Sequence, residues 1–301
     1  MSDEPKRNLP ASIRQRLLNL SQKQRQPFDL VLARYGIERL LHRLSCSRYA
    51  DRFLLKGAML FVVWNQTVPR PTRDVDLLGF GSTDLDEMRS VFADLCRQET
   101  MPDGLEFSPE SVRAEPIREA ASYPGIRITL QARLSNARIP IQIDIGFGDV
   151  VTPGPEKIEF PSLLDFPAPR LRAYPLCTVI AEKLNALVLL GINNTRMKDF
   201  FDLWFLSRHF QVEGRLLTEA IRNTFQRRQT PLPNGTPVAF GSEFEKAKTS
   251  QWELFLKRNS LAAVPLASVQ ESLSRFALPA LQAASTGSAF EHRWDYDSGW
   301  Q

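Results

Sequence analysis

Histidine and cysteine are scarce in this sequence. Among its 301 residues are three histidines and three cysteines; the cysteines are widely scattered along the chain, and so are the histidines. Their spacing matches neither a zinc site nor a disulfide framework. Isolated cysteines of this kind are typical of free thiols in a reducing compartment. The N-terminal residues are polar and lack the apolar core of a secretory signal. We therefore expect a cytoplasmic protein.

Long hydrophobic runs are missing as well. Apolar stretches such as Ala58 to Trp64 are far too short to cross a bilayer, which takes about 20 residues. The sequence also has no internal repeat and no long low-complexity tract. Its hydrophobic fraction of 43% and charged fraction of 24% are ordinary for globular proteins. We expect one large domain or two smaller ones with a buried core, and no membrane partner.

Positive charge is concentrated at the N-terminal end. Residues 1–48 hold ten Lys and Arg against four Asp and Glu, a net charge of +6. The whole chain has a net charge of +4, so the remainder carries −2. A basic segment can attract a polyanion such as RNA. The same charges are also typical of an ordinary solvated helical face, and charge alone does not separate the two interpretations.

Hydrophobic periodicity divides the chain into two regions. Residues 1–170 are predicted to form an α/β lobe with basic N-terminal helices, residues 171–285 an all-helical lobe, and residues 286–301 a flexible tail. Alternation predicts a strand at 74–78 and two strands at 126–134 and 140–147, joined through Asn136 and Ala137 as an antiparallel hairpin. Helices are predicted at 11–22, 26–45, 58–64, 84–97, 178–190, 198–209, 214–228, 242–257 and 267–283.

Two aspartates share one face of the strand predicted at 74–78. Asp74 and Asp76 stand at positions i and i+2, so their side chains point the same way. Adjacent carboxylates repel each other unless a cation neutralises them. Mg²⁺ prefers such oxygen ligands and often combines one or two carboxylates with substrate phosphates. An Asp-x-Asp pair is also common among exposed loop acids, so the pair becomes informative only together with other residues.

A third aspartate lies in the second strand of the predicted hairpin. Asp144 is flanked by Ile143 and Ile145, and its side chain must point away from theirs. That direction leads either to an ordinary exposed sheet face or to the face that carries the first two aspartates. In the second case Asp144 completes a metal site for phosphoryl transfer and is placed to accept the proton of an attacking hydroxyl.

Two further groups of residues fit the chemistry of a triphosphate. Lys56 and Gly57 precede a predicted helix, where a glycine and free N–H groups favour close approach of a phosphate. Lys183 is the lone cation in an apolar helical stretch, and a lysine there can neutralise charge in a transition state. Asp199 and Asp202 share one helical face and can orient Lys183 or Arg196; they can equally form an ordinary surface salt bridge. Arg73 is a second candidate cation beside the first aspartates.

Together these segments resemble the AbiEii/AbiGii-type nucleotidyltransferase toxin family, the toxin half of type IV toxin–antitoxin systems. The resemblance covers roughly residues 28–210 and rests on the joint order and spacing of short motifs. Those motifs are Lys56-Gly57-Ala58, Arg70 to Asp76, Ile143-Asp144-Ile145, Glu182-Lys183-Leu184 and Lys198 to Leu203.

The resemblance implies an α+β fold, with a polymerase-β-like nucleotidyltransferase core built on a mixed sheet and followed by the helical lobe. It implies Mg²⁺ or Mn²⁺ at Asp74 and Asp76, triphosphate binding near Gly57 and Ala58, an essential lysine at Lys183 and an essential acid at Asp199 or Asp202. Members use NTPs, and some add nucleotides to the 3′ end of tRNA and so block translation. A cognate antitoxin protein restrains them.

We therefore predict a metal-dependent nucleotidyltransferase that acts on an RNA 3′ end, with tRNA as the expected acceptor. Three alternatives stay open at this point. The acceptor hydroxyl can belong to a protein or a small molecule. The chain can be a module that binds nucleotide or antitoxin without turnover. Clustered acids and a lysine also suit a metal-dependent nuclease, which shortens RNA instead of extending it.

Overall fold

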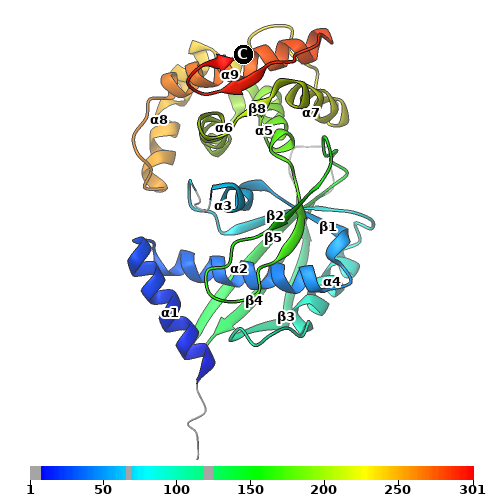
Figure 1. Ribbon diagram of the computed structural model, residues 1–301, viewed down its shortest axis with the longest axis vertical. Helices are drawn as coiled ribbons and strands as arrows, with labels where there is room; N and C mark the ends of the chain where they lie inside the picture. Colours follow the sequence, from blue (N-terminus) through cyan, green and yellow to red (C-terminus); the bar gives the residue numbers. More distant parts are fainter. Residues whose placement is uncertain (1–7, 66–68, 118–124) are drawn as a thin grey trace, which may run out of the picture. The chain divides into compact units, whose positions relative to one another are not determined.

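The computed structural model describes residues 8–65, 69–117 and 125–301 (Figure 1). The chain divides into two compact units. Unit 1 consists of Met1–Gly148 and Glu156–Ala173, and unit 2 consists of Asp149–Pro155 and Tyr174–Gln301. The short segment Asp149–Pro155 thus joins unit 2, although it precedes the last part of unit 1 in the sequence. This interleaving differs from the predicted division into consecutive lobes at about residue 170.

Unit 1 is built on a mixed seven-stranded sheet with the order β3-β4-β5-β2-β1-β7-β6. Strands β2 and β5 pair in parallel, as do β1 and β7, and the other neighbours are antiparallel. The predicted mixed sheet is therefore confirmed. Its strands are β1 (Phe53–Lys56), β2 (Asp74–Gly79), β3 (Leu105–Pro116), β4 (Gly125–Leu134), β5 (Ala137–Phe147), β6 (Glu156–Glu159) and β7 (Arg170–Ala173).

One face of this sheet is buried beneath helices. Strands β4 and β5 alternate strictly between buried and accessible residues, so each has one apolar face. The helices α1 (Leu9–Gln24), α2 (Phe28–Cys46) and α4 (Leu85–Arg97) belong to this unit and pack on its strands. Apolar residues of α2, α4, β2 and β5 meet around one small apolar space: Leu40, Leu41, Leu44, Phe92, Leu95, Val75, Leu77 and Ile143. The opposite face of β2, β4 and β5 carries the polar residues.

The β4–β5 hairpin turns one residue earlier than the sequence analysis predicted. Leu134 pairs with Ala137, so the turn residues are Ser135 and Asn136, and Ser135 has a left-handed φ of 56°. A turn at Asn136 and Ala137 would have placed Asp144 opposite Thr129. In the observed register Asp144 faces Arg127. A small shift of the turn changes every cross-strand partner, because the pairing of a hairpin is determined by its turn.

Three strands of the sheet were missing from the prediction. Strand β3 is long, but its register shifts between Ser108 and Arg113, and the irregularity interrupts its alternation. Strands β6 and β7 lie in the proline-bearing stretch that was interpreted as a connection between lobes. Short strands at the edge of a sheet bury few residues and therefore leave little periodic signal.

Helix α2 carries buried charges that tie it to other parts of unit 1. Arg43 donates to both carboxylate oxygens of Asp103, at 2.6 and 3.2 Å. The carboxylate of Glu38 accepts a hydrogen bond of 2.8 Å from the backbone N–H of Leu163. Burial raises the pKa of Glu38 to about 7, although this hydrogen bond and the nearby charge of Arg39 favour its ionised form.

Unit 2 is mainly helical. Its helices are α5 (Leu176–Leu190), α6 (Met197–His209), α7 (Gly214–Arg227), α8 (Ser242–Arg258) and α9 (Leu266–Thr286). The unit also contains a small sheet of order β10-β9-β8, made of β8 (Val212–Glu213), β9 (Arg293–Asp295) and β10 (Gly299–Trp300). The expectation of an all-helical lobe was therefore wrong in this detail.

The segment expected to be a flexible tail contributes two of these strands. Trp294 of β9 is 2% exposed and donates its indole N–H to the backbone oxygen of Ser207 at 2.7 Å. The ring of Phe276 lies edge-on to it, with centroids 5.0 Å apart. Strands of two and three residues are too short to show a period, so their sequence does not reveal them.

One helical stretch, Leu176–Asn193, is long and apolar enough to cross a membrane by length and composition alone, with a mean hydropathy of 1.5. This stretch differs from the expectation that the apolar runs of the chain are far too short to cross a bilayer. The stretch includes α5, whose residues Leu184 and Leu187 are fully buried in the structure. Core helices of globular proteins have the same composition, so the observation is weak evidence for a membrane span.

Candidate active site

The polar face of unit 1 brings the predicted aspartates onto neighbouring strands. Asp74 and Asp76 lie on β2 with the buried Val75 between them, so their side chains share the face opposite to the helices. Asp74 is exposed and Asp76 is half-buried. Strand β5 runs parallel to β2 and places Asp144 directly beside Asp76. The prediction that Asp144 lies on the face of the first two aspartates is therefore confirmed at the level of strand register.

A row of four charged residues crosses the sheet at this level. Lys56 on β1 pairs with Asp76 on β2, Asp76 with Asp144 on β5, and Asp144 with Arg127 on β4. Directly opposed residues of neighbouring strands lie about 5 Å apart. Two carboxylates in the middle of the row therefore have a cation on each outer side, which offsets part of their mutual repulsion.

Arg127 is a site residue that the sequence analysis missed. Its guanidinium holds both oxygens of Asp144, with Nε and an Nη donating at 2.8 and 2.7 Å. The two side chains are 41% and 22% exposed, so the pair stands at the surface of the sheet. A two-pronged arginine–carboxylate contact fixes the orientation of the carboxylate. Correct placement of the hairpin turn would have revealed this partner.

Gly57 makes room for the carboxylate of Asp76. It has a left-handed φ of 72°, and a Cβ atom at this position would lie 2.0 Å from a carboxylate oxygen of Asp76. Any side chain would collide with that oxygen. From the sequence, this glycine is predicted to allow the close approach of a phosphate. The structure shows a different close approach, between the glycine backbone and an acid of the site.

The remaining predicted residues of unit 1 are Ala58 and Arg73. The helix expected at 58–64 consists of a 3-10 turn, Gly57–Met59, followed by the short α3 (Leu60–Asn65). Ala58 is 5% exposed and belongs to the core. The Arg73 guanidinium forms an ion pair with Asp29 at the start of α2. A role for Arg73 beside a triphosphate therefore requires it to leave that partner.

Two of the three predicted metal ligands are suited to binding a divalent ion. Asp74 and Asp76 supply oxygen ligands of the type that Mg²⁺ and Mn²⁺ prefer, on one accessible strand face. Asp144 is the predicted third ligand, but its two oxygens are bound by Arg127. In the described ranges, no group of three or more His, Cys, Asp or Glu side chains is arranged to hold a metal ion. Metal binding by Asp74 and Asp76, and by Asp144, stays a prediction.

Unit 2 holds the second group of predicted residues. Lys183 on α5 donates to Asp199 at 3.0 Å and to Asp202 at 2.7 Å, and Arg196 binds the other oxygen of Asp199 at 2.7 Å. The carboxylates belong to α6, where spacing of three residues puts them on one side of the helix. The prediction that these acids orient Lys183 and Arg196 is consistent with the geometry.

The two ion pairs of Lys183 are almost completely shielded from solvent, whereas the Arg196 side chain is 40% exposed. The side chain of Lys183 is 11% exposed, and those of Asp199 and Asp202 are 2% and 0% exposed. Burial disfavours the charged form of Asp199, but Lys183 and Arg196 outweigh burial and hold its pKa well below the usual range. The alternative of an ordinary surface salt bridge is therefore excluded for these residues.

A second buried network on α5 went unnoticed in the sequence. Arg228 binds both oxygens of Asp149 at 3.1 Å and contacts Glu182 at 2.9 Å. Tyr174 donates its hydroxyl to the same oxygen of Glu182 at 3.2 Å. Burial opposes the charge of Arg228, but Glu182 and Asp149 more than compensate and raise its pKa. Asp149 and Tyr174 each begin a segment of unit 2, so this network anchors both segments within the unit.

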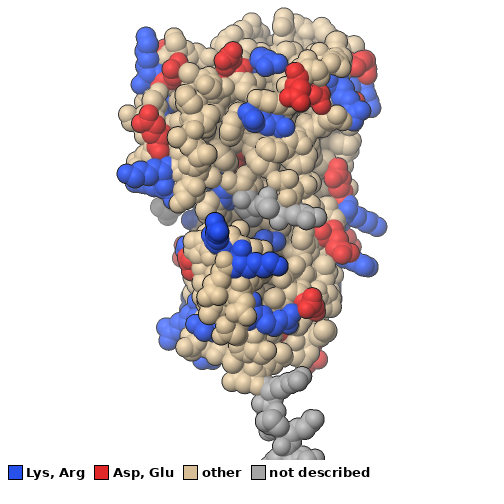
Figure 2. Space-filling view, turned by 60° about the vertical axis from the view of Figure 1, so that its left-hand side comes forward, with Lys and Arg blue, Asp and Glu red and all other residues tan. Residues whose placement is uncertain are grey.

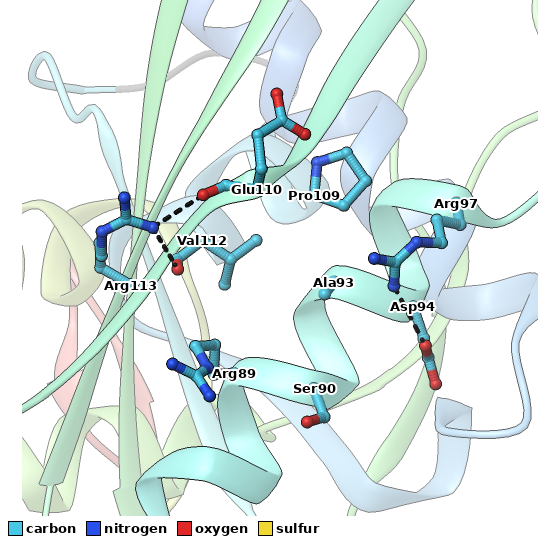
Figure 3. Close-up of a pocket in the computed structure, with 9 residues that line it drawn as sticks. All are labelled: Arg89, Ser90, Ala93, Asp94, Arg97, Pro109, Glu110, Val112 and Arg113. Atoms are coloured by element: carbon cyan, nitrogen blue, oxygen red, sulfur yellow. Dashed lines mark hydrogen bonds and ion pairs between the residues drawn. The ribbon is translucent and has the colours of Figure 1, made fainter.

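An open pocket of about 380 Å³ lies elsewhere on unit 1, between α4 and the irregular part of β3 (Figure 3). Three arginines line it, namely Arg89, Arg97 and Arg113. Arg97 pairs with Asp94 at 3.6 Å, and Arg113 donates to the backbone oxygens of residues 110 and 112. None of the predicted site residues lines this pocket.

A protein family and two solved structures are similar to this chain. The family model described as nucleotidyl transferase AbiEii toxin, type IV toxin–antitoxin system, matches residues 39–283. The crystal structure of JHP933 from Helicobacter pylori is similar at 15% identity and a TM-score of 0.46, over 83% of this chain and 88% of that one. The crystal structure of a candidate nucleotidyltransferase from H. pylori is similar at 13% identity and a TM-score of 0.41, over 82% and 89%. No curated protein sequence matches the chain.

Proposed function

Because the chain belongs to the AbiEii nucleotidyl transferase toxin family of type IV toxin–antitoxin systems, we propose that it transfers a nucleotide from an NTP to the 3′ hydroxyl of an RNA. The chain is a nucleotidyltransferase by its family; the metal, the acceptor and the cellular effect belong to the proposal. The row of charges that brings Asp76 and Asp144 together, with Asp74 beside it on β2, is the observation that supports it.

Asp74 and Asp76 are the residues that we expect to hold Mg²⁺ or Mn²⁺. They lie on one strand face, and the glycine turn at Gly57 leaves space for the carboxylate of Asp76. A bound divalent ion would neutralise triphosphate oxygens and the charge that develops during in-line displacement. Lys56, next to Asp76 in the sheet, adds a fixed positive charge on the same face.

Asp144 is placed to accept the proton of the attacking hydroxyl. Its carboxylate stands on the accessible face beside Asp76, and Arg127 orients it through both oxygens. A general base must be held within hydrogen-bond reach of the proton that it takes. In this proposal Arg127 contributes by fixing the base in position, and it shifts to one oxygen when the other accepts the proton.

Lys183 is proposed to stabilise negative charge on the triphosphate. Its ammonium is held at 3.0 Å and 2.7 Å from two acids, which fix its position and maintain its charge in a buried setting. Asp199 and Asp202 are then positioning residues that act through the lysine. Electrostatic stabilisation by a fixed cation of this kind is a major source of rate enhancement in phosphoryl transfer.

RNA is the acceptor that the charge distribution favours. Helix α1 carries Arg14, Arg16 and Lys23 and contains no acidic residue. In Figure 2, where the left-hand side of Figure 1 is turned forward, several blue side chains lie over the lower part, with few red ones among them. Such a surface binds phosphates without reading sequence. We propose tRNA as the acceptor, because a nucleotide added at its 3′ end would block the position of the amino acid and so stop translation.

The family also implies a cognate antitoxin protein that restrains this enzyme.

Sequencing of RNA 3′ ends tests the proposal directly. Purified chain is incubated with total RNA and each labelled NTP in the presence of Mg²⁺ or of EDTA. We expect extended tRNA ends and released pyrophosphate with Mg²⁺ only. Label on protein or on a small molecule instead of RNA would identify another acceptor. Shortened RNA would indicate a nuclease, and nucleotide binding without pyrophosphate release would indicate a module without turnover.

A further inference from the structure

The accessible face of the β4–β5 hairpin continues beyond the acids without a break. From the Asp144–Arg127 pair toward the hairpin turn, the directly opposed residues on this face are Gln142 with Thr129, Pro140 with Gln131, and Arg138 with Arg133. Each of these side chains is exposed or half-buried, and every intervening residue of the two strands is buried. The face extends about 20 Å along β5 from Asp144 to Arg138, at about 3.3 Å per residue.

The end of this face near the turn has the chemistry of a surface for a polyanion. Between residues 125 and 147 the chain has three arginines and one acid, Asp144. The neighbouring strands add Glu106, Arg113 and Glu115 from β3 and Asp74 from β2 to the same face, so positive charge dominates only near the turn, at Arg133 and Arg138. Thr129, Gln131 and Gln142 supply neutral hydrogen-bonding groups between the arginines at the two ends. Glu106 on the neighbouring edge strand contacts Arg133 at 3.4 Å, and both side chains are largely exposed, at 72% and 63%. A contact of this exposure stabilises little and is easily exchanged for a phosphate.

A protein partner would require a different surface. Protein interfaces bury an apolar centre, often with aromatic residues. The exposed large hydrophobic residues in the described part of the chain all lie outside β4 and β5; they are Leu9, Phe80, Met101, Val150, Leu189, Val238 and Leu254. Without aromatic rings, the face also has no platform on which bases could stack.

From these observations we infer that the β4–β5 face is the track along which the acceptor RNA strand reaches the acids, named here the hairpin track (Arg127, Thr129, Gln131, Arg133, Arg138 and Gln142). The inference rests on the proposed transfer to an RNA end. Arg133 and Arg138 contact phosphates at the far end of the track, and the Thr and Gln side chains bind phosphate or ribose hydroxyl oxygens. The 3′ hydroxyl thereby arrives at Asp144, independently of RNA sequence.

The test uses two matched pairs of arginines. The variant Arg133→Gln with Arg138→Gln removes two charges from the track. The control Arg89→Gln with Arg97→Gln removes two charges from α4, at side chains 56% and 63% exposed that line the pocket in Figure 3. Affinity for a fluorescent RNA stem–loop with a single-stranded 3′ end is measured by anisotropy without NTP, over a range of salt concentrations.

We expect the track variant to weaken RNA binding about tenfold at 0.1 M salt, and the control variant less than twofold. The slope of log affinity against log salt should fall by roughly 1.4 in the track variant, because each phosphate contact to a single strand contributes about 0.7. Thermal melting and NTP affinity should match the wild type in both variants, which shows that the fold and the nucleotide site are intact.

Other results would contradict the proposal that RNA binds along the hairpin track. Equal losses in both variants would mean general attraction to a basic surface, and a larger loss in the control would place RNA at the pocket on α4. An unchanged RNA affinity, with a smaller mass in sedimentation, would assign the face to contact between copies of the chain. Failure of the proposed function looks different: the wild type then extends no RNA with any NTP. Extension with an unchanged KM for RNA in the track variant keeps the function and refutes the track.

Discussion

The acids of this protein occupy two contrasting environments. On the open face of unit 1, Asp74 is exposed and Asp76 half-buried, side by side on one strand. In unit 2, Asp199 and Asp202 are buried and their charge is already balanced by Lys183 and Arg196. Accessible carboxylates of like charge favour an added cation, whereas buried ones need their partners for the fold. The first group is therefore suited to binding substrate, and the second to holding a lysine in position.

Removal of an acid from the open face should affect activity and leave stability intact. We expect Asp76→Asn to lower nucleotide transfer about 10³-fold, because a ligand that stabilises transition-state charge is worth several kcal/mol. The free energy of unfolding in urea should stay within about 0.5 kcal/mol of the wild type, since a repulsion is also relieved. Pyrophosphate release measures the first quantity. The exposed Asp86→Asn on α4 is the control, and equal activity of both variants would contradict the assignment.

Removal of the cation from the buried group should affect stability first. Lys183→Met leaves two buried carboxylates without their shared partner, which costs about 3–5 kcal/mol of unfolding free energy. Urea denaturation measures this loss. Adding Asp199→Asn and Asp202→Asn to that variant should recover much of the stability without restoring transfer. A Lys183→Met variant as stable as the wild type would show that these acids are not charged in the fold.

The backbone at Gly57 leaves the space that the carboxylate of Asp76 occupies. A methyl group at Gly57 meets the carboxylate of Asp76 at 2.0 Å, and the backbone is left-handed there. Gly57→Ala should therefore displace Asp76 and lower transfer about 10²-fold, a smaller effect than its removal. Gly81→Ala is the matched control, because Gly81 has a φ of 93° and its added Cβ meets no atom closer than 3.9 Å. Similar activity of the two variants would mean that Asp76 tolerates displacement.

The carboxylate of Glu38 is buried, and its hydrogen bond and neighbouring positive charges do not fully offset the rise in pKa that burial causes. Its folded pKa of about 7 lies above its ordinary value of 4.5, so the folded chain binds a proton that the unfolded chain releases within this range. The contribution of this group to the free energy of unfolding has its full value below about pH 4.5. It falls as the pH rises towards 7 and does not change further above pH 7. The decline should amount to roughly 3 kcal/mol, because the pKa rises from 4.5 to about 7 and each pKa unit corresponds to about 1.4 kcal/mol. Urea titrations at several pH values should show it in the wild type and not in Glu38→Gln.

Much of the architecture was predictable from local pattern. Helical spacing identified α1, α2 and α5 to α9 within a few residues of their ends, because each buries one apolar face at a regular interval. Alternation identified β2, β4 and β5, and with them the face on which Asp74, Asp76 and Asp144 lie. Strands β3 and β6 to β10 escaped, since their irregularity or shortness removes the period on which such reasoning depends.

The candidate site was predictable in its residue types and less so in its contacts. Asp74 and Asp76 follow from the two-residue repeat of a strand, and Lys183 from its isolation in an apolar helix. Arg127 required the register of the hairpin, and the contact between Gly57 and Asp76 required the pairing of β1 with β2. Such partners are distant in the chain, and their meeting depends on turns and strand order that short-range pattern does not encode.

The sequence by itself therefore determined which side chains share a face and which type of reaction their chemistry suits. Within a strand or helix, the direction of each side chain follows from its position in that element and does not depend on the rest of the chain. Only the tertiary structure decided which charged side chains form ion pairs. It pairs Asp144 with Arg127 and buries Asp199 and Asp202 against Lys183, because burial and neighbouring charges depend on segments that are far apart in the sequence.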